Sequence, residues 1–207
     1  MIEEYEAWLA NRNQKPNIIR FYLRTLNTLF CKAANKGMLD EERKLFGRVR
    51  LSYVTTTKRA LSESDILALQ NLKLEAGTTL AFARDMFMFS FYMRGMPFVD
   101  IAYLKKSDLK NGILTYCRKK TNQPLFVEWE QVHQEIVERY AHQTEDSPYM
   151  FPIIKQTDGT EYKQYKRVQE KVNRTLKKIG KMIDLKTPLT AYVARHSWAS
   201  IARDMNI

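Results

Sequence analysis

The side chains of this sequence that could do chemistry are mostly cations toward its C-terminal end. Arg195 and His196 are adjacent and open an apolar stretch that follows Pro188 and Thr190. A guanidinium can bind two oxygens of a phosphate at once, and a neighbouring imidazole can support it by hydrogen bonding. These residue types therefore favour chemistry at a phosphate group.

A strongly basic segment precedes this pair. Residues 155–186 hold ten Lys or Arg against four Asp or Glu, so +6 of the net charge of +11 lies within 32 residues. Cations along a helix neutralise backbone phosphates and release counterions, which predicts binding to DNA; a solvated helix face is the alternative. The predicted DNA contacts of this segment are Lys163, Lys166, Arg167, Lys171, Arg174, Lys177 and Lys178.

Helices and one hairpin must position these groups. Residues 112–118 and 124–129 are predicted as two strands joined by a lysine-bearing turn. The apolar run at 86–92 predicts a central core helix. Asn17 is the predicted N-cap of a long helix. The sequence thus predicts a mainly α fold with a small β-hairpin sheet, in the α+β class. Apolar spacing places the helices at about 2–10, 17–36, 62–74, 78–92, 98–104, 130–141, 161–183 and 189–205.

A stretch without helical periodicity divides the chain. Residues 51–60 contain three consecutive threonines and predict an extended linker. Before this linker, a short turn of helix is predicted at 40–45. Ser62 and Asp65 then form a capping-box pattern that starts a new helix. The predicted organisation is a helical domain over residues 1–50, a linker over 51–60 and a second domain over 61–207.

Composition excludes several other functions. No apolar run is long enough to cross a membrane, so no membrane partner is predicted. His133, His142 and His196 are too scattered for a metal site, and no glycine-rich phosphate loop is present, so neither metal nor cofactor is predicted. Cys31 and Cys117 are predicted to be buried free thiols of a cytoplasmic protein.

The order of these elements resembles the tyrosine recombinases, the phage-integrase family, over essentially the whole chain. The segments KRALS (58–62), FYMRGMPFVD (91–100) and YVARH (192–196) resemble integrases of Bacteroides-type mobile elements. The resemblance implies double-stranded DNA as the partner. It also implies site-specific recombination, in which a DNA strand is broken and rejoined through a 3′-phosphotyrosyl intermediate without a cofactor.

The resemblance implies roles on the last helix. Arg195 would clamp the scissile phosphate and stabilise the charge that develops there, with His196 supporting it. Tyr192 stands where the family usually has a histidine and would donate to the phosphate. The alternatives are a surface arginine, a buried structural histidine and a packing tyrosine.

Further roles fall on the hairpin and on the end of the core helix. Lys120 matches the family's catalytic lysine, which acts as a general acid for the departing 5′ oxygen. Lys119 is the second candidate for this role and a predicted DNA contact. The alternative is an ordinary polar turn. Pro97 stands where the family's first arginine belongs, so Arg94 is the predicted substitute clamp. Asp100 matches the acidic residue that supports the basic groups, and helix capping is its alternative.

Compared with members of that family, this sequence is expected to be a fragment that is truncated at both ends. Residues 1–50 resemble part of a core-binding domain, and the chain ends at Ile207, before the tyrosine nucleophile. A truncated catalytic domain of this kind would be inactive alone, unless another protomer of an oligomer on DNA supplied the tyrosine. A non-catalytic protein that occupies recombination sites is the alternative function. An RNA-binding or purely structural helical protein is a third.

Overall fold

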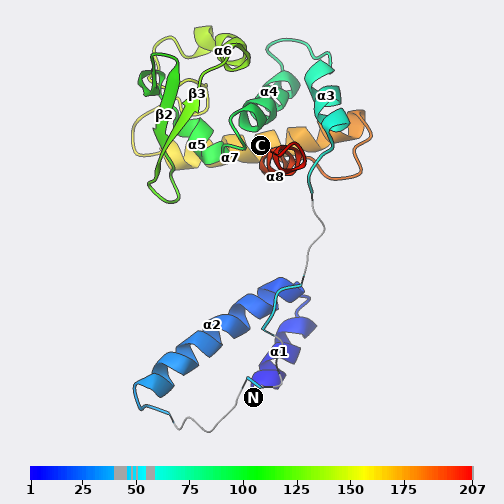
Figure 1. Cartoon of the computed structure of the whole chain (residues 1–207), viewed down its shortest axis with the longest axis vertical. Helices are drawn as coiled ribbons and strands as arrows, with labels where there is room; N and C mark the ends of the chain where they lie inside the picture. The colour runs from blue at the N-terminus through cyan, green and yellow to red at the C-terminus, as the bar shows by residue number, and fades with distance from the viewer. Residues whose placement is uncertain (40–45, 48, 50, 55–58, 207) are drawn as a thin grey trace. The chain divides into compact units, whose positions relative to one another are not determined.

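The computed structural model describes residues 1–39, 46–47, 49, 51–54 and 59–206, and the chain divides into two compact units, Met1–Thr57 and Lys58–Ile207 (Figure 1). The turn of helix predicted at 40–45 and the linker positions 55–58 lie outside the described residues. The described fold is mainly helical with one small antiparallel sheet, which confirms the predicted α+β class. The assignment of the units as core-binding and catalytic domains stays a prediction.

Two helices, α1 (Ile2–Asn11) and α2 (Pro16–Asn35), form the first unit. The prediction that Asn17 caps α2 is wrong, because Lys15 is the N-cap and Pro16 takes the first helical position. Proline suits that position, where its missing N–H would have no helical acceptor. The Asn17 side chain instead accepts from the Val54 N–H at 2.8 Å and donates to the Val54 carbonyl at 3.0 Å.

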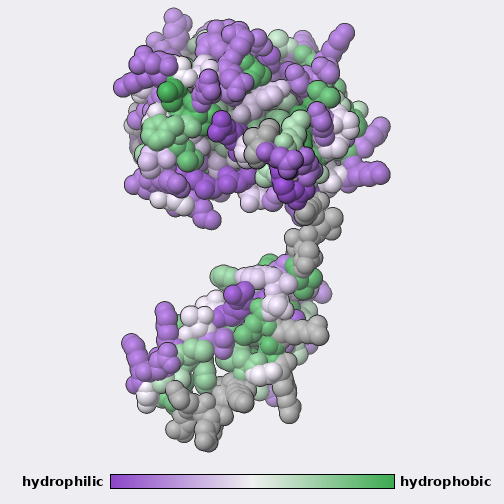
Figure 2. Space-filling model, in the orientation of Figure 1, coloured by the Kyte–Doolittle hydropathy of each residue, from purple (hydrophilic) through white to green (hydrophobic). Residues whose placement is uncertain are grey.

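The apolar spacing that predicts α2 does not mark its buried face. Ile18, Phe21 and Leu29 are 40%, 57% and 58% exposed, whereas Ile19 and Leu23 are the buried residues of the helix. Two helices can cover only the line along which they touch, so most of the apolar surface stays outside. Apolar side chains accordingly show along this unit in Figure 2.

The second unit is built around α4 (Thr79–Tyr92). Residues 85–90 of α4 are all buried, and the helix contacts five other helices, which confirms the predicted central core helix. In Figure 1, α7 runs beneath α4 and α5. The other helices of the unit are α3 (Glu63–Asn71), α5 (Phe98–Tyr103), α6 (Gln131–Glu138), α7 (Glu161–Met182) and α8 (Ala191–Asp204).

A three-stranded antiparallel sheet of order β1-β2-β3 flanks the helices. The predicted hairpin is confirmed as β2 (Ile113–Cys117) and β3 (Pro124–Glu128), in a register that pairs Thr115 with Phe126. β1 (Leu109–Lys110) was not predicted, because two residues are too few to show a strand pattern. Short 3₁₀ turns, η1 (Lys106–Asp108) and η2 (Ala141–Gln143), lie in the connections.

Two polar contacts fix the ends of this unit. The predicted capping box is confirmed, since Ser62 accepts from the Asp65 N–H and Asp65 accepts from the Ser62 N–H. The buried Ser197 hydroxyl of α8 accepts from the Leu61 N–H at 2.9 Å and donates to the Val193 carbonyl at 2.8 Å. Ser197 therefore joins the first residues of the unit to its last helix, 136 positions away.

Both cysteines are free and exposed, so the prediction of buried thiols is wrong. Cys117 falls on the outward side of β2, where the alternation of the strand buries Leu114 and Tyr116 instead. Cys31 lies on α2, most of whose surface is exposed. Free cysteine is among the most often buried residue types, and this general tendency is wrong at both positions.

In the described part of the chain, no helix is both long enough and apolar enough to cross a membrane. The same residues contain no group of three or more side chains placed to hold a metal ion.

Candidate active site

Arg195 lies in the first half of α8 and packs against the turn that ends α4. Its Nη1 donates to the Gly95 carbonyl at 3.3 Å, across 100 positions of sequence. A Cβ placed on Gly95 would lie 2.8 Å from the Arg195 Cα and 2.9 Å from its Cγ. The helix carrying Arg195 therefore sits as close to this turn as glycine permits, which holds the half-buried guanidinium in place.

Two left-handed residues in succession make that turn. Arg94 has φ of +55° and Gly95 has φ of +74°. Met96 closes the turn, because both its N–H and that of Gly95 donate to the Ser90 carbonyl, at 3.1 and 2.8 Å. Arg94 is thus brought next to the residue that contacts Arg195, and its own side chain is exposed.

Pro97 takes a structural part at the position where the family's first arginine would stand. It is the N-cap residue of α5, with φ of −60° and ψ of 145°. The pyrrolidine ring of proline restricts φ to near this value. Pro97 therefore supplies no cation to this region.

Asp100 joins α5 to the hairpin. Its side chain is 3% exposed, and Oδ1 accepts from the Lys119 backbone N–H at 2.9 Å. It makes no capping bond to α5, so helix capping does not describe its role. The carboxylate instead holds the backbone of the hairpin turn at the residue before Lys120. That Asp100 orients the basic groups stays a prediction.

Cations surround the carboxylate of Asp100. Burial raises its pKa, while the Lys119 N–H and the charges of Arg118, Lys119 and Arg195 act in the opposite direction. Its second oxygen, Oδ2, is buried and has no hydrogen-bond partner among the described residues. Arg195, Arg118 and Lys119 are therefore gathered around one buried acid.

Arg118 is a site residue that sequence reasoning missed. Its Nε is buried and has no hydrogen-bond partner in the described part of the chain. Burial and the charge of Asp100 raise the pKa of the neighbouring Tyr116 to about 12, although the charges of Arg118 and Arg195 lower it. The strand period could have found this residue, because Leu114 and Tyr116 point inward and Arg118 is the next position on that side.

The two hairpin lysines have different surroundings. The Lys119 ammonium lies 4.1 Å from the centre of the Tyr103 ring, a cation–π contact that occupies the side chain. Lys120 is exposed in the turn and forms no ion pair with any residue that the structure describes. Of the two side chains, that of Lys120 is therefore the freer to reach a ligand. Its role as an acid stays a prediction.

Tyr192 and His196 form an exposed pair one turn apart on α8. Their rings meet edge to face, with centroids 4.7 Å apart, and Tyr192 is 64% exposed. His196 is exposed, so the alternative of a buried structural histidine does not apply. The structure places both rings where a ligand can reach them and gives neither a hydrogen bond to Arg195.

The basic residues of α7 lie on one side of the helix. Lys163, Arg167, Lys171, Arg174 and Lys178 follow at intervals of four, four, three and four residues, and all five are exposed. Val172, Leu176 and Ile179 face the core on the other side. Lys177 is exposed, and Lys166 lies over the rings of Tyr162 and Tyr165. That this face contacts DNA stays a prediction.

The raised pKa of Asp100 has a consequence for stability. The folded state binds this proton more tightly than the unfolded state, so stability falls as pH rises from the ordinary value of 3.8 to the raised value. Asn in place of Asp100 keeps an acceptor for the Lys119 N–H but does not titrate. Urea unfolding of wild type and Asp100→Asn between pH 4 and 7 should give a smaller decline for the variant. Parallel curves would contradict the assignment.

No family model matches the sequence, and no curated protein matches it. Among solved structures, the crystal structure of XerA recombinase is similar to this chain, with a TM-score of 0.45 and 17% sequence identity. The similarity covers 98% of this chain and 68% of that chain. A likeness at this level does not assign a family, so the function proposed below rests on the residues of the site.

Proposed function

We propose that this protein binds duplex DNA through the phosphate backbone and serves in site-specific DNA recombination. The observation that carries the proposal is that two segments far apart in the sequence meet at one buried acid. Lys119 of the hairpin turn donates its backbone N–H to Asp100, and the charge of Arg195 on α8 acts on the same carboxylate. Arg195 also donates to the Gly95 carbonyl in the turn after α4. Of these residues, the resemblance to tyrosine recombinases assigns Arg195 to the phosphate clamp, Lys119 to the reserve for the general acid and Asp100 to the support of the basic groups.

The proposed phosphate site uses Arg195 and Arg118. Arg195 donates one N–H to the Gly95 carbonyl, and the buried Nε of Arg118 has no hydrogen-bond partner among the described residues. Partly buried guanidiniums attract an anion more strongly than exposed ones, because little water screens them. Arg118 would supply the second clamp that Pro97 cannot, and the exposed Arg94 would reach the flanking backbone.

The proposed general acid is Lys120, in the hairpin turn that Asp100 anchors through the Lys119 N–H. The exposed Tyr192 and His196 would contact the phosphate or its neighbours from α8. Strand breakage through a phosphotyrosyl bond also needs a nucleophile, and we assign that role to no residue of this sequence. The same contacts without the chemical step would let the protein occupy a recombination site.

Binding to duplex DNA over a salt series tests the proposal. Arg195→Ala removes a charge-assisted contact with phosphate, so affinity should fall about tenfold or more, and the slope of log K against log salt should shrink by about one. Arg203→Ala is the matched control. It removes an exposed arginine from the end of the same helix, paired with Asp204, and should change neither quantity.

Two outcomes would go against this function. The absence of binding at low salt would reject DNA as the partner, and an equal loss of affinity in Arg195→Ala and Arg203→Ala would reject a specific phosphate clamp.

A nicked suicide substrate then tests for the chemical step. A covalent protein–DNA adduct would show that a tyrosine of this chain is reactive, and binding without an adduct would favour occupancy alone.

A further inference from the structure

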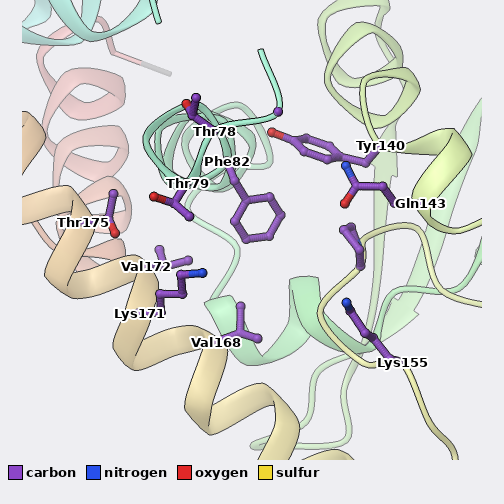
Figure 3. Close-up of a pocket in the computed structure, with 12 residues that line it drawn as sticks. Thr78, Thr79, Phe82, Tyr140, Gln143, Lys155, Val168, Lys171, Val172 and Thr175 are labelled. Atoms are coloured by element: carbon purple, nitrogen blue, oxygen red, sulfur yellow. The ribbon is translucent and has the colours of Figure 1, made fainter. Parts of the chain in front are cut away.

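A cavity of about 250 Å³ lies between the N-terminal end of α4, the middle of α7 and the loops near Tyr140 and Pro152 (Figure 3). It is distant from the candidate active site. The active-site turn follows the other end of α4, and a helix of 14 residues is roughly 20 Å long. None of Gly95, Asp100, Arg118 or Arg195 lines the cavity.

One part of the wall is apolar. The Phe82 ring points into the space in Figure 3, and Val168 and Val172 of α7 face it from below. Tyr140 packs edge to face against Phe82, with ring centroids 5.3 Å apart. The Tyr140 hydroxyl donates to Asp85 at 2.8 Å, so the residue offers its ring and not its O–H to the cavity. This wall suits the apolar body of a small molecule.

Two lysines give the wall a positive charge. Lys155 and Lys171 come from different segments, and Figure 3 shows both ammonium groups turned toward the space below the Phe82 ring. No Asp or Glu lines the cavity, and neither lysine forms an ion pair with a residue that the structure describes. Thr78 and Thr79 place the positive end of α4 at the rim, which adds to the attraction for an anion.

We propose that this cavity binds a small organic anion, namely a carboxylate with an aromatic or short aliphatic body. The two ammonium groups would hold the carboxylate, and Phe82 and the two valines would cover the body. A bare phosphate would make no contact with the apolar wall, and a neutral apolar molecule would make no charge-assisted contact with the two lysines. The volume lies just under the range of about 300–1,000 Å³ that is usual for small-molecule sites, which sets the ligand at a few carbons or one ring.

Titration of the full ¹⁵N-labelled chain with phenylacetate, followed by amide chemical shifts, tests the proposal. Phenylacetate should shift the amides of Thr78, Phe82 and Val172, and should bind at least tenfold tighter than either of two comparison probes. The first, 2-phenylethanol, keeps the ring but lacks the charge. The second, inorganic phosphate, keeps a charge but lacks the ring.

Charge removal at the cavity supplies the second measurement. Lys155→Gln and Lys171→Gln should each weaken phenylacetate binding about tenfold, as expected for loss of one charge-assisted contact. Lys181→Gln is the control. Lys181 is an exposed lysine of α7, as Lys171 is, but it does not line the cavity, so the variant should leave phenylacetate binding unchanged.

Several results would overturn the proposal. These are no shift at millimolar phenylacetate, equal binding of 2-phenylethanol, or equal weakening by all three lysine variants. If phosphate binds as tightly as phenylacetate and the Lys155 and Lys171 variants lose DNA affinity, the two lysines are backbone contacts. Because this titration contains no DNA, its outcome does not depend on that of the recombination proposal.

Discussion

Replacing Gly95 by Ala should destabilise the second unit by about 2–5 kcal/mol and displace Arg195. Two costs add. A left-handed φ of +74° costs an alanine about 1–2 kcal/mol. The new methyl group would also lie 2.8 Å from the Arg195 Cα, a backbone contact that cannot rotate away, and overpacking of this kind costs about 1–3 kcal/mol. Urea unfolding measures the stability, and duplex binding measures the displacement of the guanidinium.

Gly112→Ala separates the two costs. Gly112 has the same φ of +74°, and a Cβ there would meet no atom within 4 Å. This variant should lose only the conformational part, about 1–2 kcal/mol, and should bind DNA as the wild type does. Equal destabilisation by the two variants would mean that α8 does not press on the turn as described, and the positioning of Arg195 would need another cause.

Removing the carboxylate of Asp85 should cost about 3–5 kcal/mol, the largest effect that we expect from one substitution. Asp85 is 2% exposed and accepts from Arg84 Nε at 2.6 Å, Arg139 Nη1 at 2.9 Å and the Tyr140 hydroxyl at 2.8 Å. Asp85→Ala would leave the largely buried Arg84 without its counter-charge and without an acceptor for Nε, and would leave the buried Tyr140 hydroxyl without an acceptor. Urea unfolding at neutral pH should show the loss as a lower midpoint.

The chain contains a matched control for this substitution. Arg203 and Asp204 are also adjacent on a helix and are also paired, at 2.7 Å, but their side chains are 64% and 66% exposed. Asp204→Ala should change stability by no more than about 1 kcal/mol, because water screens the pair and solvates either partner alone. Similar losses in the two variants would contradict the burial of Asp85. A small loss in both would show that its three bonds do not form together.

The sequence predicted the helices and the hairpin well, because each depends on local spacing. The apolar run at 86–92 leaves no solvent-facing side, so α4 had to be a core helix. The capping box at Ser62 and Asp65 joins groups three residues apart, and it formed as predicted. Local reasoning failed at Asn17, where Pro16 started the helix earlier, and on the exposed side of α2.

The candidate site shows the same division between local and distant information. The types of Arg195, Lys120 and Asp100, and their order along the chain, are readable from sequence. The sequence does not show which hairpin lysine has a free side chain, because the Lys119 ammonium is held by a tertiary contact with the Tyr103 ring. Arg118 was also missed, because its importance comes from the acid and the arginine that the fold brings to its side.

The sequence by itself determined the element types, the central position of α4 and the basic character of α7, all of which follow from spacings of a few residues. Tertiary structure alone decided the rest. The pairs Arg84–Asp85 and Arg203–Asp204 have the same local pattern and opposite burial. The contact of Gly95 with Arg195 spans 100 positions. Burial and close approach depend on which distant segments pack together, and packing is a property of the whole chain that no local pattern contains.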